Sequence, residues 1–256
     1  MQSEITGIIL LDKPAGFTSR AVVDEIKKMF GVKSAGHVGT LDPGATGVLP
    51  ILLGRATRVA PAFERLDKEY LATVHLHKDV GDEELKAALK EFVGTRKQRP
   101  PVKSAVARVV RERRVYSIDV LGRDGKDVRL RIACEAGTYI RKLASDLGDK
   151  IGGAHLKELR RTRAGPFDER MACSMENVNA NAVLPIEKAV EHMPKVVVKP
   201  EAVNLILKGS AIEKEHIVKQ DDAKGLVAIM SEKCELLALG LPRGSTVKIE
   251  RVVAKY

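Results

Sequence analysis

Tryptophan is absent from this sequence of 256 residues, and the other aromatic residues are few, with five Phe and four Tyr. Modules that bind single-stranded nucleic acid on a sheet surface stack bases on clustered aromatic side chains. No such cluster occurs along the chain. The composition therefore excludes a stacking platform of the RRM kind.

Cysteine is also scarce, and Cys134, Cys173 and Cys234 lie far apart with no CxxC pair. An odd number of isolated cysteines supports neither a disulfide framework nor a cysteine zinc site, so we expect reduced and mostly buried thiols. His75 and His77 are two residues apart and would share one side of a strand. Catalytic zinc needs three protein ligands and no third one lies nearby in the sequence, so we expect no metal site.

Long apolar runs are missing as well. The longest, such as VLPILLG from Val48, fall short of the roughly 20 residues that a membrane-spanning helix needs. The start, MQSEITGIILLDK, carries an acid where a signal peptide has its basic region. We therefore expect a cytoplasmic protein that does not contact the membrane.

Positive charge is present in excess, with a formal net charge of +10. The segment from Arg96 to Arg114 contains eight basic residues and the single acid Glu112, so most of the excess lies there. Such density repels itself unless a polyanion neutralises it, and we predict that Arg108, Arg111, Arg113 and Arg114 bind a phosphate backbone. The alternative is a solvated charged face that binds nothing.

The pattern of apolar residues predicts a chain of mixed helices and strands. We expect a strand from Gly7 and a helix capped by Thr18 or Ser19 and stopped by Gly31. Further helices are predicted over 56–67, 82–92 and 138–151, the last capped by Thr138, with strands over 69–77, 104–110, 114–121 and 128–135. From Val196 a separate unit of short strands begins.

The segment from Gly36 to Pro50 contains four Gly and two Pro in fifteen residues, which predicts a loop with sharply defined turns. It matches neither a Walker A loop nor a dinucleotide fingerprint. Asp42, followed by Pro43 and flanked by glycines, would be offered from a fixed backbone to a closely approaching ligand. An ordinary Asx-Pro turn explains the same spacing equally well.

Five segments together resemble the TruB/dyskerin family of RNA pseudouridine synthases, and they occur in the family's order. They are LDKPAGFTS, GHVGTLDPGATGVLP, KEY, EAGTYIRKLASDLG and GAHLKELRRT. The resemblance implies an α+β fold: a catalytic domain over 1–194 with a mixed, mainly antiparallel sheet flanked by helices, and a small C-terminal β-barrel PUA domain over 195–256. QRPPVKSAVARVV and LKGSAI are similar to the archaeal and eukaryotic dyskerin branch.

The resemblance also implies roles for single residues. Asp42 matches the catalytic aspartate, Tyr70 the tyrosine that stacks on the target base, and Arg141 the arginine that pairs with the aspartate. His37 matches the histidine beside the flipped nucleotide, and Leu159 an apolar residue of the pocket. Lys13 matches a lysine that we interpret as structural. The reaction needs an ionised carboxylate, which we expect a neighbouring Arg141 to keep charged in a buried site, and no cofactor or metal.

In the dyskerin branch a box H/ACA guide RNA selects the uridine, so the resemblance implies guide RNA, rRNA and small H/ACA core proteins as partners. The loop LDPGATG is closer to the bacterial form, which keeps stand-alone action on the TΨC loop of tRNA open. A second class of function is a non-catalytic RNA-binding scaffold of a ribonucleoprotein. Asp42, Tyr70 and Arg141 favour the enzyme, since a scaffold need keep none of them.

Overall fold

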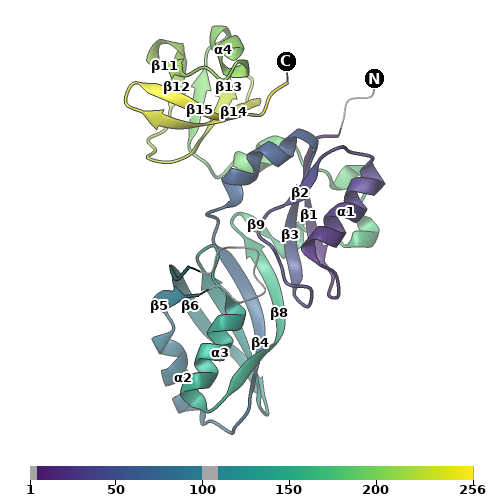
Figure 1. Ribbon diagram of the computed structural model, residues 1–256, viewed down its shortest axis with the longest axis vertical. Helices are drawn as coiled ribbons and strands as arrows, with labels where there is room; N and C mark the ends of the chain where they lie inside the picture. The colour runs from purple at the N-terminus through teal and green to yellow at the C-terminus, as the bar shows by residue number, and fades with distance from the viewer. Residues whose placement is uncertain (1–4, 100–108, 256) are drawn as a thin grey trace.

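The computed structural model describes residues 5–99 and 109–255 as two β-sheets with helices packed on them (Figure 1). The strands of the first sheet are β1 (Gly7–Lys13), β2 (Ala35–His37), β3 (Thr46–Leu53), β4 (Lys68–Leu76), β5 (Gly94–Gln98), β6 (Arg111–Asp124), β7 (Asp127–Cys134), β8 (Ala154–Ala164) and β9 (Phe167–Asp168). Those of the second are β10 (Lys195–Val198), β11 (Ile212–Glu213), β12 (Ile217–Gln220), β13 (Val227–Ser231), β14 (Leu236–Arg243) and β15 (Thr246–Val252).

Four α-helices and several 3-10 helices connect these strands within the described ranges. The α-helices are α1 (Ser19–Phe30), α2 (Asp82–Glu91), α3 (Ile140–Ile151) and α4 (Val203–Leu207). The 3-10 helices are η1 (Gly54–Phe63), η2 (Glu169–Met171), η3 (Met175–Asn177), η4 (Ala180–Ala182), η5 (Ile186–Val190), η6 (Pro200–Ala202) and η7 (Lys214–His216). None of the helices described is long and apolar enough to cross a membrane.

The first sheet consists of two halves joined by β8. Its strand order is β1-β3-β8-β4-β7-β6-β5, with β2 on β3 and β9 on β8. β8 runs antiparallel to β4 along most of its length, but it pairs with β3 in parallel only at Thr46 and Gly47. Figure 1 shows the consequence: α1 lies with β1 to β3, whereas α2 and α3 lie over the other half. The mixed, mainly antiparallel sheet flanked by helices is confirmed.

A single apolar core underlies both halves of this sheet. Leu11 and Leu49 of one half belong to the same buried cluster as Ala72 and Leu130 of the other, together with Leu143 of α3. β4 alternates fully between buried and partly exposed residues, which is the period-2 pattern of a strand with one face on the core.

The second sheet has the order β11-β15-β14-β13-β10-β12 and forms the separate body at the C-terminal end in Figure 1. One of its cores is its own, with Val196, Ile206 and Val247 at the centre. A second core is shared with the first sheet, because Met230, Leu239 and Val253 pack in one cluster with residues such as Val48 and Val59.

Several boundaries differ from the sequence-based expectation. The loop expected through Pro50 ends at Ala45, because the apolar run from Val48 to Leu53 is buried in β3 despite its proline. The helix expected over 56–67 is the 3-10 helix η1, which contains Pro61. The strand expected over 104–110 lies largely outside the described residues, and residues 109–110 are not in a strand. β8 was not expected at all, since its charged residues hide the alternation.

Helix caps were predicted with mixed success. Thr18 is the N-cap of α1, accepting a hydrogen bond from the Ala21 N–H, and Gly31 ends the helix in a left-handed conformation, both as expected. Thr138 does not cap α3; its hydroxyl donates to the Glu135 carbonyl instead. Of the three cysteines, Cys134 is buried, Cys173 is intermediate and Cys234 is exposed, which corrects the expectation that most are buried.

Candidate active site

The loop between β2 and β3 holds Asp42 by fixing the residues on both sides of it. The buried Ser19 hydroxyl accepts from the Leu41 N–H and donates to the Leu41 carbonyl, both at 2.9 Å. On the other side, the Pro43 carbonyl accepts from the Gly16 N–H at 2.9 Å and from Lys13 Nζ at 3.3 Å. Lys13 is itself fully buried and donates to two further carbonyls, of Pro14 and Phe17. Asp42 therefore extends from a backbone that has little freedom to move.

Arg141 in the first turn of α3 forms an ion pair with Asp42. The start of α3 is fixed by Gln98 of β5, whose side chain accepts from the Tyr139 N–H at 3.0 Å and donates to the Tyr139 carbonyl at 3.4 Å. Both partners of the ion pair are about half exposed, with 48% and 50% of their side chains accessible. The expectation of a buried carboxylate is thus wrong, and the screened pair acts mainly as a geometric restraint.

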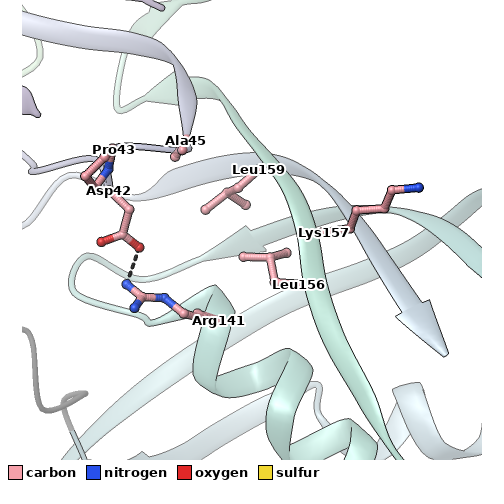
Figure 2. A pocket seen from close by; sticks show the side chains of 8 residues that line it. Asp42, Pro43, Ala45, Arg141, Leu156, Lys157 and Leu159 are labelled. Atoms are coloured by element: carbon pink, nitrogen blue, oxygen red, sulfur yellow. Dashed lines mark hydrogen bonds and ion pairs between the residues drawn. The ribbon is translucent and has the colours of Figure 1, made fainter. Parts of the chain in front are cut away.

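A cavity of about 390 Å³ opens beside this ion pair (Figure 2). Its lining residues are Asp42, Pro43, Gly44, Ala45, Arg141, Leu156, Lys157 and Leu159. Asp42 and Arg141 meet at one side, and Leu156 and Leu159 of β8 form an apolar wall, while the Lys157 side chain points away from Asp42 (Figure 2). The volume falls within the range of roughly 300–1,000 Å³ typical of small-ligand sites. Three predicted residues, Asp42, Arg141 and Leu159, are thus brought together.

Tyr70 and His37 do not line this cavity. Tyr70 is only 8% exposed and lies in the core, where burial above all raises the pKa of its hydroxyl, with the Asp42 charge contributing. His37 is half-buried, and burial, followed by the charges of Arg161 and Arg20, lowers its pKa, so the ring is neutral near pH 7. Its Nδ1 is buried without a hydrogen-bond partner in the described structure.

Three of the four predicted phosphate-binding arginines lie together at the start of one strand. Arg108 lies outside the described residues, and Arg111, Arg113 and Arg114 are on β6. Arg113 Nη1 lies 3.5 Å from Glu135, and the Arg114 guanidinium lies 5.9 Å from the Tyr116 ring centroid. No ion pair of Arg111 occurs within residues 5–99 and 109–255.

The structure adds a third histidine to the pair His75 and His77. His155 on β8 lies opposite His75, and its Nδ1 is 2.9 Å from His77 Nε2. His75 Nδ1 is 2.6 Å from Asp127. The arrangement is a hydrogen-bonded network, and in the described part of the chain no group of three or more His, Cys, Asp or Glu is placed to hold a metal ion.

Sequence reasoning missed two residues of this site, Ser19 and Arg161. Ser19 stood out only as a possible helix cap, although its hydroxyl binds the residue before Asp42. Arg161 has 1% of its surface exposed, and it donates to the carbonyls of Gly39 and Val48 in the segment that carries Asp42. Both belong to the motifs LDKPAGFTS and GAHLKELRRT, but only the three-dimensional contacts give them a role.

Two family models match the chain over adjacent ranges. The model for the N-terminal domain of TruB family pseudouridylate synthases matches residues 27–140, and that for the C-terminal domain of tRNA pseudouridylate synthase B matches residues 141–202. Asp42 and Arg141 thus lie in ranges matched by different models.

Curated relatives are similar over nearly the whole chain. A probable tRNA pseudouridine synthase B of Methanopyrus kandleri is 45% identical over 260 residues, covering 93% of this chain and 76% of the relative. Its counterpart in Pyrococcus abyssi is 47% identical over 266 residues, covering 96% and 80%.

Solved structures are also similar to this chain over nearly its whole length. A Cbf5-Nop10-Gar1 complex contains a chain of 43% identity with a TM-score of 0.88, covering 97% of this chain and 85% of that one. An H/ACA RNP bound to a substrate RNA containing 2'-deoxyuridine contains one of 40% identity with a TM-score of 0.86. Since family models match most of the chain and relatives above 40% identity cover more than nine-tenths of it, the chain belongs to the TruB family of pseudouridine synthases.

Proposed function

We propose that Asp42 is the catalytic carboxylate of an RNA pseudouridine synthase whose target uridine is selected by a box H/ACA guide RNA. The observation that carries the proposal is the rigidly held Asp42, paired with Arg141 at a cavity with an apolar wall. A carboxylate on a loose surface turn would lack both restraints.

The chemistry fits these residues. Isomerisation breaks the bond from C1' to N1 of uracil and forms one from C1' to C5, while C5 loses a proton and N1 gains one. Asp42 would act at the sugar as nucleophile or base. Arg141 would hold the carboxylate in place, and Leu159 would contact the flipped base. Unstacking the uridine costs a few kcal/mol, which base contacts in the site must offset.

Tyr70 and His37 take supporting roles in this proposal. With only 8% of its surface exposed, Tyr70 can contact a base only through the small part of its ring that reaches the surface. His37 would meet the nucleotide as a neutral ring, because its pKa is lowered chiefly by burial. A neutral imidazole can donate or accept a hydrogen bond, but it adds no charge to the site.

The proposed partners resemble those in the solved complexes of similar chains. Chains similar to this one were solved with Nop10 and Gar1 and in an H/ACA RNP with substrate RNA, which supports guide RNA, rRNA and small H/ACA core proteins as partners here. Arg108, Arg111, Arg113 and Arg114 would contact the RNA backbone. Action on tRNA is the second candidate, favoured by the description of the curated relatives as tRNA pseudouridine synthases.

The C-terminal sheet is proposed to be a PUA domain that grips the guide RNA. The division proposed from the sequence is 1–194 and 195–256, and a core of its own around Val196 and Ile206 supports it. The TruB C-terminal model extends to residue 202, so the boundary lies within that match.

The test is the variant Asp42→Asn, assayed by release of tritium from C5 of uridine in target RNA with and without guide RNA. We expect turnover to be lost and RNA affinity to stay near wild type, because the change removes a charge at the chemistry and no phosphate contact. Asp168→Asn, which changes an aspartate paired with Arg170 outside the cavity, is the control and should remain active. Appreciable turnover by Asp42→Asn would refute the role of Asp42, and a wild-type protein that binds RNA without turnover would favour the scaffold.

A further inference from the structure

Arg161 is a charged side chain with almost no contact with solvent, since only 1% of its surface is exposed. Its Nε donates to the Val48 carbonyl and its Nη2 to the Gly39 carbonyl, both at 2.7 Å. These carbonyls flank the loop that carries Asp42, one before it and one after it. A single guanidinium therefore ties together the two ends of the catalytic loop.

Arg161 also lies against the other half of the sheet. Burial raises the pKa of the Tyr70 hydroxyl, the Arg161 charge lowers it by a smaller amount, and the Arg161 backbone lies between Gly47 of β3 and Tyr70 of β4. This is the junction where β3 and β8 pair at only two positions. Gly47 lets the strands approach there, because an added Cβ would lie 2.1 Å from the Arg161 carbonyl oxygen, and its φ of 100° is one that other residues rarely adopt.

The charge of Arg161 is not neutralised by an acid. No carboxylate in the described ranges forms an ion pair with it. A buried cation without a counter-ion is unfavourable, and a neutral side chain could bridge two carbonyls at a lower cost. The planar fork of arginine, however, can direct several N–H groups at once to acceptors on different elements. A buried guanidinium is therefore expected where several N–H donors must point to different elements at once.

We infer that Arg161 is a positioning residue for the isomerisation: it sets the Asp42 loop of one half of the sheet against Tyr70 and Arg141 of the other. The inference rests on the proposed function, since it assumes that Asp42 performs the chemistry. Arg161 does not line the cavity, so we do not expect it to contact the substrate. It acts through the loop and through the Tyr70 hydroxyl.

The experiment compares Arg161→Met, Arg161→Lys and the control Arg170→Met in single-turnover tritium release at saturating RNA. Arg170 is exposed and lies outside the cavity. Its replacement by Met removes one positive charge, as Arg161→Met does. We expect Arg161→Met to lower the rate about 100-fold or more, the effect of a small misplacement of reacting groups, with unchanged RNA affinity. Arg161→Lys should lose less, since it keeps the charge and the N–H donors of an ammonium group, although not the planar fork. Thermal unfolding shows whether each variant is folded at the assay temperature, and Arg161→Lys carries the test if the Met variant is not.

A double-mutant cycle with Tyr70→Phe distinguishes positioning through Tyr70 from a general loss of rigidity in the protein. If Arg161 acts partly through the Tyr70 hydroxyl, the two losses will be less than multiplicative, whereas independent effects multiply. Folded variants with wild-type rates would overturn the inference, as would losses confined to RNA affinity or strictly multiplicative losses. An inactive wild-type protein, or an active Asp42→Asn variant, would instead refute the proposed function, so the two failures can be told apart.

Discussion

Lys68, the first residue of β4, is a lysine held inside the protein, 8% exposed, with Nζ donating to the Leu66 carbonyl. Burial above all, and then the charge of Arg161, lowers its pKa from 10.5 to about 8. The unfolded chain therefore binds a proton at Lys68 between pH 8 and 10.5 that the folded chain does not bind. Over this window the stability contributed by Lys68 rises with pH.

Replacing Lys68 by Met should remove this dependence. Because the two pKa values differ by about 2.5 units, the stability of Lys68→Met relative to wild type should fall by about 3 kcal/mol between about pH 8 and pH 10.5. Urea unfolding at several pH values measures the difference. Lys28→Met, which removes an exposed lysine of α1, is the control. A difference that stays constant with pH for Lys68→Met would mean that burial does not lower the pKa of Lys68.

At the scale of single elements, the first residues of β6 include three arginines in unlike surroundings. The Arg113 side chain forms an ion pair with Glu135, while those of Arg111 and Arg114 are exposed and form no ion pair in the part of the chain that the structure describes. If β6 binds RNA, the exposed pair should carry most of the interactions with phosphates. For each phosphate that the protein no longer neutralises, the slope of log affinity against log salt falls by about 0.7 to 0.9.

We therefore expect Arg111→Gln with Arg114→Gln to flatten the salt dependence of RNA binding by up to about 1.4 to 1.8, and Arg113→Gln alone to change it much less. Fluorescence anisotropy with labelled RNA over a range of salt concentrations measures the slopes. Arg123→Gln, at the far end of β6 and paired with Asp82, is the control. A wild-type slope in the double variant would place this strand away from the RNA.

The helices and strands also show how much of the fold can be predicted from the sequence alone. Local signals predicted three features correctly: Thr18 the start of α1, Gly31 its end, and the alternation of residues the strand β4. β8 has no such signal, because its position between β3 and β4 is decided by partners more than 75 residues away, as in the pairing of His75 with His155. For the same reason the cavity residues Asp42, Arg141 and Leu159 could be grouped only by resemblance, and Arg161, an arginine among other charged residues, showed nothing of its burial.

At the scale of the whole molecule, the C-terminal sheet stabilises the first sheet, because residues of both pack in one apolar core. Arg55 and Arg58 of η1 donate to the carbonyls of Val253 and Val252, at 3.2 and 2.8 Å, and Leu239 packs in the cluster that contains Val48 of β3. β3 begins directly after the Asp42 loop. Removing residues from Pro194 onward would therefore expose the apolar surface of the first sheet around Val48 as well as remove the proposed PUA domain.

Point substitutions test this coupling in the intact chain. Leu239→Ala should destabilise the protein by about 2–4 kcal/mol and speed hydrogen exchange in β1 as well as in β14. Leu237→Ala, on the same strand but in the separate C-terminal core, should affect β14 and leave β1 protected. Exchange that rises only in β14 for both variants would show that the two sheets open independently.

The position of β8 also constrains how the chain folds. β3 and β4 are synthesised early, yet the strand that separates them begins only at Ala154. Until then the edge of β4 that β8 covers has no partner, and it can pair wrongly with another strand or with a second chain. Closing the sheet requires contacts between distant parts of the chain, which slows folding. The site around Asp42 therefore forms late, and a nascent chain stalled before residue 154 is the species most exposed to aggregation.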